Sequence, residues 1–199
     1  MSTLLLPKFN VPELDISIPN IFNGTTVCIC GKPGSGKTSL CLTIVKNCIN
    51  YAKEKVIYFS TKEKVSNIIN YANKFGIDLE KLMYDNQFYI ELLRPVDIKM
   101  MAKNESIKIF ELSQAYKASK IVIDSFNYIS EAFDNTYEKM TYSLKILNDI
   151  SNYCPMLITT YDIRKKDFGK FNLEYISDIN LILDYYYESA NNYIKRYLL

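Results

Sequence analysis

Apolar positions follow two different periods along this chain, and segments of the two kinds alternate. Short runs rich in β-branched and aromatic residues predict buried strands at 25–30, 56–60, 87–93, 121–123 and 156–160. Between them, apolar residues recur at helical spacing and predict helices over 38–52, 65–75, 98–119 and 140–150. Strands that alternate with helices indicate an α/β fold, with a mainly parallel sheet covered by helices on both faces.

The two ends of the chain depart from this alternation. Pro7, Pro12 and Pro19 predict that residues 1–20 form an extended N-terminal arm that lies on a single domain spanning 21–199. At the other end, apolar runs at 179–187 and 193–199 predict a C-terminal antiparallel hairpin that closes one edge of the sheet.

Composition narrows the chemistry. A chain of 199 residues can bury a full core, and it has no histidine, which excludes imidazole bases and every zinc site that uses imidazole. The 24 basic residues include only three arginines, so several guanidinium clamps on phosphates are not available. Phosphate chemistry must therefore rely on lysine, a metal ion or the backbone. The net charge of +2 is too small to predict a long-range electric field that would attract nucleic acid or a membrane.

The five cysteines indicate the redox compartment. Their number is odd and most lie in apolar runs, which predicts buried reduced thiols in a cytoplasmic protein. Alternation along a strand would place Cys28 and Cys30 on the same face, where small core side chains are the ordinary interpretation. No apolar run approaches the ~18 residues that a membrane span needs.

A glycine-rich loop follows the first predicted strand and precedes the first predicted helix. The segment 31–38 fits the pattern G-x-x-x-x-G-K-[ST], whose backbone N–H groups surround phosphate oxygens at a helix N-terminus. Lys37 would contact the β and γ phosphates, and the Thr38 hydroxyl would bind Mg²⁺. The expected nucleotide-binding residues are Gly31, Pro33, Gly34, Ser35, Gly36, Lys37, Thr38 and Ser39.

Asp124 ends the buried strand at 121–123. Because the carboxyl ends of parallel strands share one edge of a sheet, this carboxylate is expected beside the phosphate loop. The sequence therefore predicts Asp124 as a second residue of the Mg²⁺ site, together with Thr38.

These features resemble the RecA/RadA and KaiC-like P-loop ATPases. The resemblance rests on Gly24 before the first strand, on the segments 31–38, 56–63 and 121–127, and on Ile176-Ser177-Asp178. It extends over about residues 20–199 and implies a RecA-like P-loop NTPase core that binds ATP and Mg²⁺. It also implies assembly as a homo-oligomer, or with a related recombinase or a regulatory protein.

The resemblance also assigns catalytic roles. Members of the family carry one or two glutamates after the second strand that polarise the attacking water, and Glu63 occupies the second of these places while Lys62 occupies the first. A solvated charge at a helix start is the alternative for Glu63. Thr160 stands where recombinases place a polar γ-phosphate sensor. KaiC-like members continue into a basic finger that reaches the neighbouring subunit, and this chain, which ends at Leu199, is expected to lack it and to hydrolyse ATP slowly.

A basic segment at 161–172 follows the fifth predicted strand. It combines cations with aromatic residues, a combination that suits single-stranded DNA, and recombinases contact DNA through the corresponding loop. A solvated surface loop is the alternative interpretation. The candidate DNA-binding residues are Arg164, Lys165, Lys166, Phe168 and Lys170.

The sequence therefore predicts a recombinase paralogue that acts in DNA recombination or repair as a slow ATPase, because the basic segment favours that function. The alternative is a KaiC-like regulatory or assembly protein whose nucleotide state controls a protein partner. That alternative is favoured by Lys62, by Thr159-Thr160 and by the absent finger. A nucleoside monophosphate kinase fits poorly, because such kinases hold two nucleotides with several arginines.

Overall fold

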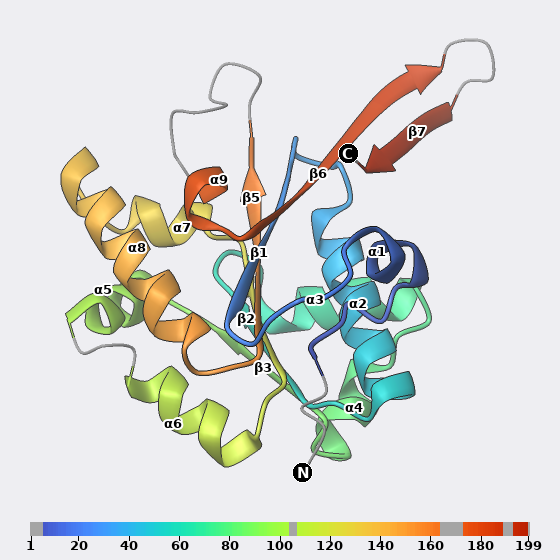
Figure 1. Cartoon of the computed structure of the whole chain (residues 1–199), viewed down its shortest axis with the longest axis horizontal. Helices are drawn as coiled ribbons and strands as arrows, with labels where there is room; N and C mark the ends of the chain where they lie inside the picture. Colours follow the sequence, from blue (N-terminus) through green and yellow to red (C-terminus); the bar gives the residue numbers. More distant parts are fainter. Residues whose placement is uncertain (1–5, 104–106, 164–172, 189–192, 199) are drawn as a thin grey trace.

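The computed structural model describes residues 6–103, 107–163, 173–188 and 193–198, and within them the chain builds one mixed sheet (Figure 1). The strand order is β3-β2-β4-β5-β1-β6-β7. Every neighbouring pair is parallel except β6 and β7, which are antiparallel. The strands are β1 (Thr25–Gly31), β2 (Val56–Ser60), β3 (Phe88–Leu92), β4 (Lys120–Asp124), β5 (Met156–Asp162), β6 (Ile179–Glu188) and β7 (Tyr193–Leu198).

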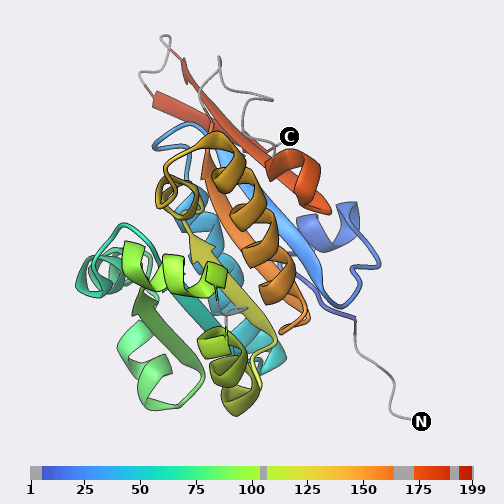
Figure 2. The same cartoon turned by 90° about the vertical axis from the view of Figure 1, so that its left-hand side faces the viewer.

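Helices cover both faces of this sheet (Figures 1 and 2). One face carries α1 (Pro12–Ser17), α2 (Lys37–Ala52), α3 (Val65–Lys74) and α4 (Leu79–Tyr84). The other carries α5 (Pro95–Lys103), α6 (Ile107–Tyr116), α7 (Asn127–Glu131), α8 (Thr136–Ser151) and α9 (Leu173–Ile176). The α/β class and the mainly parallel sheet expected from the sequence are confirmed.

The sheet divides the core into two apolar clusters because side chains alternate along each strand. Val27 and Ile29 of β1 pack toward α2, whereas Cys28 and Cys30 pack toward α8. The two thiols therefore share one face, as the alternation predicted.

All five cysteines are buried and form no disulfide, as expected for reduced thiols. Burial raises the pKa of Cys48 to about 11 and that of Cys154 to about 12. These thiols stay protonated near neutral pH, so they serve as small apolar core side chains rather than as nucleophiles.

Two segments differ from the expected elements. Residues 12–17 of the predicted extended arm form the short helix α1, because proline is tolerated in the first helical turn and Leu14 can be buried against α2. Phe9 and Leu14 join the same core cluster as Val27. The predicted helix over 98–119 is instead two helices, α5 and α6, on either side of 104–106, which lie outside the described residues. The division of the chain at residue 20 stays a prediction.

The parallel arrangement brings the carboxyl ends of β2, β4, β5 and β1 to a single edge of the sheet. Of the helices that the structure describes, none has the length and apolar character needed to cross a membrane.

Candidate functional site

The loop between β1 and α2 is shaped by its glycines. A Cβ on Gly31 would lie 2.3 Å from the carbonyl oxygen of Leu183 and 2.5 Å from the Ser35 Oγ, so no larger residue fits there. Gly34 and Gly36 have φ angles of +79° and +103°, in the left-handed region that favours glycine. The loop conformation thus requires glycine at these three positions.

The loop leaves polar groups without protein partners. Helix α2 begins at Lys37 without a side-chain cap on its first turn, so its amino end keeps N–H groups for a ligand. The hydroxyl of Ser35 is buried and has no hydrogen-bond partner among the described residues. A buried hydroxyl without a partner is costly, and an oxygen-rich anion at this helix end would satisfy it.

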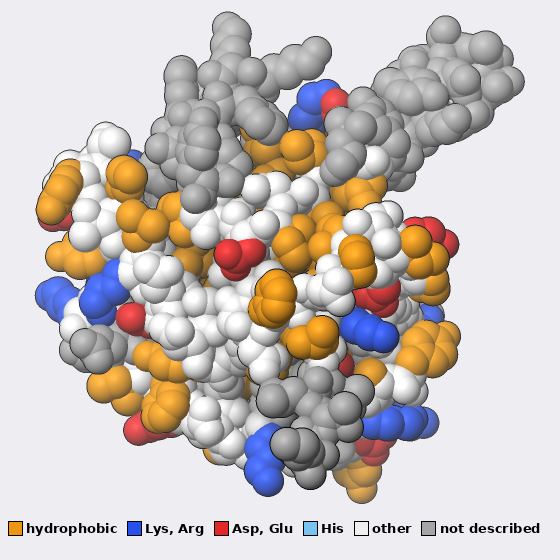
Figure 3. Space-filling view, in the orientation of Figure 1, with side chains coloured by type: hydrophobic (Ala, Val, Ile, Leu, Met, Phe, Trp, Pro, Cys, Tyr) orange, Lys and Arg blue, Asp and Glu red, His pale blue; other side chains and the backbone are white. Residues whose placement is uncertain are grey.

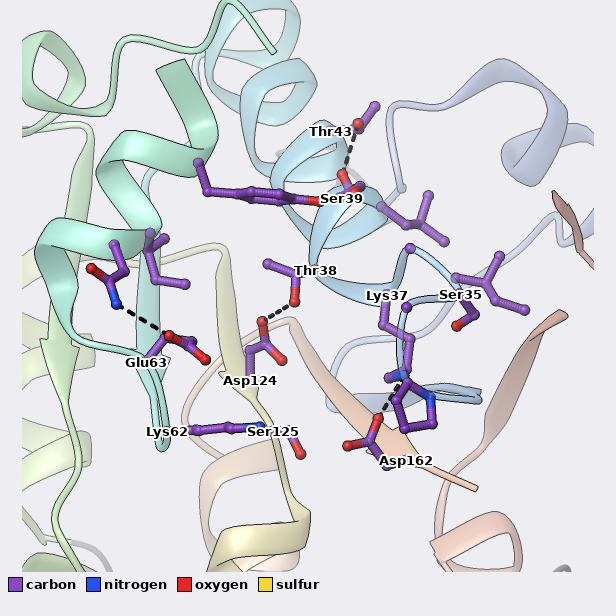
Figure 4. Close-up of a pocket in the computed structure, with 18 of the residues that line it drawn as sticks. Ser35, Lys37, Thr38, Ser39, Thr43, Lys62, Glu63, Asp124, Ser125 and Asp162 are labelled. Carbon is purple, nitrogen blue, oxygen red and sulfur yellow. Dashed lines mark hydrogen bonds and ion pairs between the residues drawn. The ribbon is translucent and has the colours of Figure 1, made fainter. Parts of the chain in front are cut away.

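Lys37 lies under the loop and its side chain is only 8% exposed. Its ammonium donates to the carbonyl oxygens of Gly31 at 3.0 Å and Lys32 at 2.9 Å. It also forms an ion pair with Asp162 at 2.6 Å, which Figure 4 shows beside the loop. Asp162 is the last residue of β5, so this contact joins the phosphate loop to the strand next to β1.

Asp124 accepts hydrogen bonds from three hydroxyls that come from three other elements. Its Oδ2 accepts from Thr38 of α2 and from Tyr58 of β2, each at 2.7 Å, and its Oδ1 accepts from Thr160 of β5 at 2.5 Å. Burial raises the pKa of Tyr58 well above its usual value, and the charge of Asp124 raises it further. The raised pKa keeps the phenol a neutral donor near neutral pH.

The loop after β2 is tied to the end of β4. Thr61 donates through its N–H to the Asp124 carbonyl at 2.9 Å and through its hydroxyl to the Ser125 carbonyl at 2.7 Å. This contact places Lys62 and Glu63 at the rim of the cavity, on the side opposite the phosphate loop (Figure 4). Glu63 is exposed and accepts a hydrogen bond from Asn67 at 3.3 Å. Lys62 lies 5.7 Å from the ring centroid of Tyr128, and a hydrogen bond to Tyr128 raises its pKa.

These groups line one cavity of about 850 Å³. Its lining includes the polar groups of Lys37, Thr38 and Asp124 and also apolar and aromatic side chains, among them Tyr71 and Phe75. Tyr71 is fixed there by a 2.7 Å hydrogen bond to Ser39 and by the ring of Phe75, whose centroid lies 4.9 Å away. The volume lies within the range of small-molecule sites. Figure 3 shows one face of the molecule, on which hydrophobic side chains are scattered among polar and charged ones.

The expected site residues are found largely together. Lining the cavity are Pro33, Gly34, Ser35, Gly36, Lys37, Thr38, Ser39, Glu63 and Asp124, with Gly31 buried directly beneath the loop. Thr160 is fully buried and reaches Asp124 without lining the cavity. The candidate DNA-binding residues Arg164, Lys165, Lys166, Phe168 and Lys170 lie outside the described residues.

The residues present suit a magnesium ion. The hydroxyl oxygen of Thr38 and a carboxylate oxygen of Asp124 are 2.7 Å apart in the lining of the cavity, and Mg²⁺ prefers such oxygen ligands. The described residues contain no group of three or more acidic, cysteine or histidine side chains that could hold a metal alone. An ion here would therefore use ligand phosphates and water as well, as magnesium commonly does.

Sequence reasoning missed several residues of the site. Tyr58, Tyr71, Phe75 and Asp162 all contribute, yet the first three were indistinguishable from core or rim aromatics. Asp162 could have been found, because it lies two residues beyond Thr160. At that position it ends the strand that pairs with β1, beside the phosphate loop.

A glycine loop that opens a helix after β1, beside an acidic strand end in this sheet, defines a P-loop NTPase with a RecA-like core. A family model described as "ATPase: KaiC" matches residues 8–199, and the chain belongs to this family.

Relatives and a solved structure agree with this family. The circadian clock oscillator protein KaiC of Nostoc sp. is 25% identical over 130 residues, covering 60% of this chain and 24% of that protein. The KaiC of Prochlorococcus marinus subsp. pastoris is 26% identical over 164 residues, covering 78% of this chain and 32% of that protein. The chain thus spans about a quarter to a third of the length of these relatives. The KaiC-like protein PH0186 of Pyrococcus horikoshii OT3 shares the fold, with a TM-score of 0.77 at 22% identity over 98% of this chain and 86% of that one.

The geometry around Asp124 yields a prediction on stability. Replacing Tyr58 by Phe removes a buried hydroxyl that donates to a carboxylate, and such bonds contribute about 1.5–3 kcal/mol. We expect Tyr58→Phe to lower the free energy of unfolding by an amount in that range, measured by urea denaturation. Because the pKa of this phenol is raised, the loss should be the same between about pH 6 and 9.

Tyr71→Phe is the matched control. It removes a hydroxyl of the same kind whose partner, Ser39, is neutral and only partly buried, so a loss of about 0.5–1.5 kcal/mol is expected. Equal losses in the two variants would mean that Tyr58 does not hold Asp124 more strongly than an ordinary hydrogen bond.

Proposed function

We propose that this chain binds ATP with Mg²⁺ in the cavity at the carboxyl edge of the sheet and hydrolyses it slowly. The observation that carries the proposal is the glycine loop at the amino end of α2, with Lys37 and Thr38 directly beside Asp124. The loop N–H groups and the Ser35 hydroxyl would bind phosphate oxygens, and Lys37 would neutralise the β and γ phosphates. Thr38 and Asp124 would hold Mg²⁺, which draws charge from the phosphates when bound.

The aromatic part of the cavity lining supports a nucleotide rather than a simple polyphosphate. Tyr71 and Phe75 provide aromatic surface in the lining of the cavity, and a purine base has the flat apolar faces that suit such a surface.

Glu63 is the proposed water-positioning residue. It lines the cavity on the wall opposite the phosphate loop, where a water molecule attacking the terminal phosphate would lie between the two walls. Its side chain is exposed, and among the described residues its one hydrogen-bond partner is Asn67, so this carboxylate is weakly fixed and slow turnover is the expected result. Thr160 would respond to the γ phosphate through Asp124, to which its hydroxyl donates.

Regulation of a protein partner by nucleotide occupancy is the cellular role that we infer. The relatives of this chain include proteins named for a circadian clock oscillator. Slow hydrolysis would also keep the ATP-bound state long enough for a partner to respond to it. The partner would be a second copy of the chain or another regulatory protein.

A recombinase-like role on single-stranded DNA is the second candidate. It is favoured by the composition of residues 161–172, where four cations and two phenylalanines occur in twelve positions. The segment begins with the last two residues of β5, the strand that ends beside the phosphate loop.

The first test is the loss of ATP binding in Lys37→Ala. The change removes the positive charge that faces the phosphates, so a fluorescent ATP analogue in the presence of Mg²⁺ should no longer bind measurably. Lys99→Ala, which removes an exposed lysine from α5, is the control and should bind as the wild type does. Equal affinity in wild type and Lys37→Ala would refute the nucleotide site.

The second test concerns Glu63. Glu63→Gln should lower the rate of phosphate release by at least about tenfold from a basal rate already far below ~10 s⁻¹, while ATP affinity stays unchanged. Glu80→Gln, at an exposed position on α4, controls for the loss of one negative charge. If Glu63→Gln hydrolyses ATP as fast as the wild type, Glu63 is a surface charge and another group positions the water.

The third test separates the two cellular roles. A single-stranded oligonucleotide should bind with a log-log salt slope near −2.8 if four cations each neutralise one phosphate, at about −0.7 per phosphate. Replacing Lys165 and Lys166 by Ala should flatten that slope, whereas Phe168→Ala should weaken binding without changing it. Fluorescence anisotropy across a salt series measures both. Absence of binding by the wild type at low salt would leave the regulatory role alone.

A further inference from the structure

The ammonium group of Lys37 is fully occupied by the protein itself. It contacts the carbonyl oxygens of Gly31 and Lys32 and the carboxylate of Asp162, at 3.0, 2.9 and 2.6 Å. An ammonium group has three N–H donors, and these three acceptors match that number. A phosphate oxygen can therefore be bound by Lys37 only after one of the three contacts is given up.

We propose that Asp162 competes with phosphate for Lys37, and that this competition sets both the affinity of the cavity for ATP and its discrimination between ATP and ADP. The inference rests on the proposed nucleotide site and adds a specificity-determining residue to it. Asp162 is not part of the glycine loop, and it reaches Lys37 from the neighbouring strand.

Of the three acceptors, Asp162 is the one that can withdraw. The carbonyl oxygens belong to the backbone of the loop, and that of Gly31 also accepts the N–H of Ile163 at 3.1 Å. The side chain of Asp162 is 38% exposed, so its carboxylate can turn away from Lys37 and become hydrated. A carboxylate and a phosphate are both anionic, so they repel each other when they share one ammonium group.

The backbone of Asp162 stays in place when its side chain moves. Its N–H donates to the Oδ1 of Asn127 at 2.8 Å, and the residue pairs in register with Gly31 of β1. The displaced carboxylate therefore remains in the wall of the cavity, which it lines (Figure 4). Its negative charge continues to oppose bound phosphates, and this opposition grows with the charge of the ligand. ATP carries one more phosphate than ADP, so Asp162 weakens the binding of ATP more.

The proposal is tested with Asp162→Asn, which preserves the shape of the side chain and removes its charge. Calorimetric titration with the non-hydrolysable β,γ-imido analogue of ATP and Mg²⁺ should show affinity increased by about tenfold or more, the size expected for a charge-assisted contact. The increase for ADP under the same conditions should be smaller, about threefold. The ratio of the two affinities separates competition at the phosphates from a general structural effect.

Asp184→Asn is the matched control. Asp184 of β6 forms an ion pair with Lys32, also at 2.6 Å, so the variant removes an equal charge beside the same loop. Asp184 does not line the cavity, and the affinity for the ATP analogue should change by less than about twofold. A second variant, Asp162→Glu, keeps the negative charge and should retain an affinity close to that of the wild type.

The possible outcomes are distinct. The proposal is overturned if Asp162→Asn binds the ATP analogue no more tightly than the wild type, or only as much more tightly as Asp184→Asn does. Weaker binding by Asp162→Asn also overturns it, and would assign Asp162 to the metal or to its water. Failure of the nucleotide site itself would be seen separately, as equal binding by wild type and Lys37→Ala.

Discussion

The carboxylate of Asp124 is the group on which the geometry of the cavity depends. Hydroxyls from α2, β2 and β5 all donate to it, from residues that are 86, 66 and 36 positions away along the chain. These three contacts are possible only because β4 lies between β2 and β5. The sheet order therefore fixes where Thr38 stands relative to Asp124, and a displacement of any one of these strand ends would be transmitted to the others through a single side chain.

Lys37 imposes the second constraint, because a buried charge without partners is costly. The protein meets that cost with two carbonyl oxygens of the loop and with Asp162. The same contacts hold the loop in shape before any ligand arrives, so its N–H groups are already arranged at the amino end of α2. The contacts of Lys37 thus have two results. They hold the loop ready for phosphate, and they make a phosphate compete with Asp162 for the ammonium group.

Local sequence patterns were enough to predict the parts of the candidate site that are contiguous in the chain. The strand, the glycine loop and the helix around 31–38 follow from spacing alone, and Asp124 follows from its place at a strand end. Tyr58 could not be identified, because a tyrosine in an apolar strand resembles a core residue until the neighbour of β2 is known. Asp162 was missed because the predicted strand ended at 160, whereas pairing with Gly31 extends β5 by two residues. Pro12 was interpreted as extended backbone, although proline also begins helices.

The charge balance of the cavity supports the proposal that ATP binds together with a divalent cation. The lining residues of the described chain include three carboxylates, Glu63, Asp124 and Asp162, but only two ammonium groups, Lys37 and Lys62. Arg94 is not among the residues that line the cavity, and it is paired with Asp97 of α5. A triphosphate would therefore enter a cavity whose side chains already carry excess negative charge, and the amino end of α2 offsets only about half a charge. Under the proposed function, a magnesium ion would supply most of the remaining compensation, so the metal would be an electrostatic condition for ATP binding as well as a participant in the proposed hydrolysis.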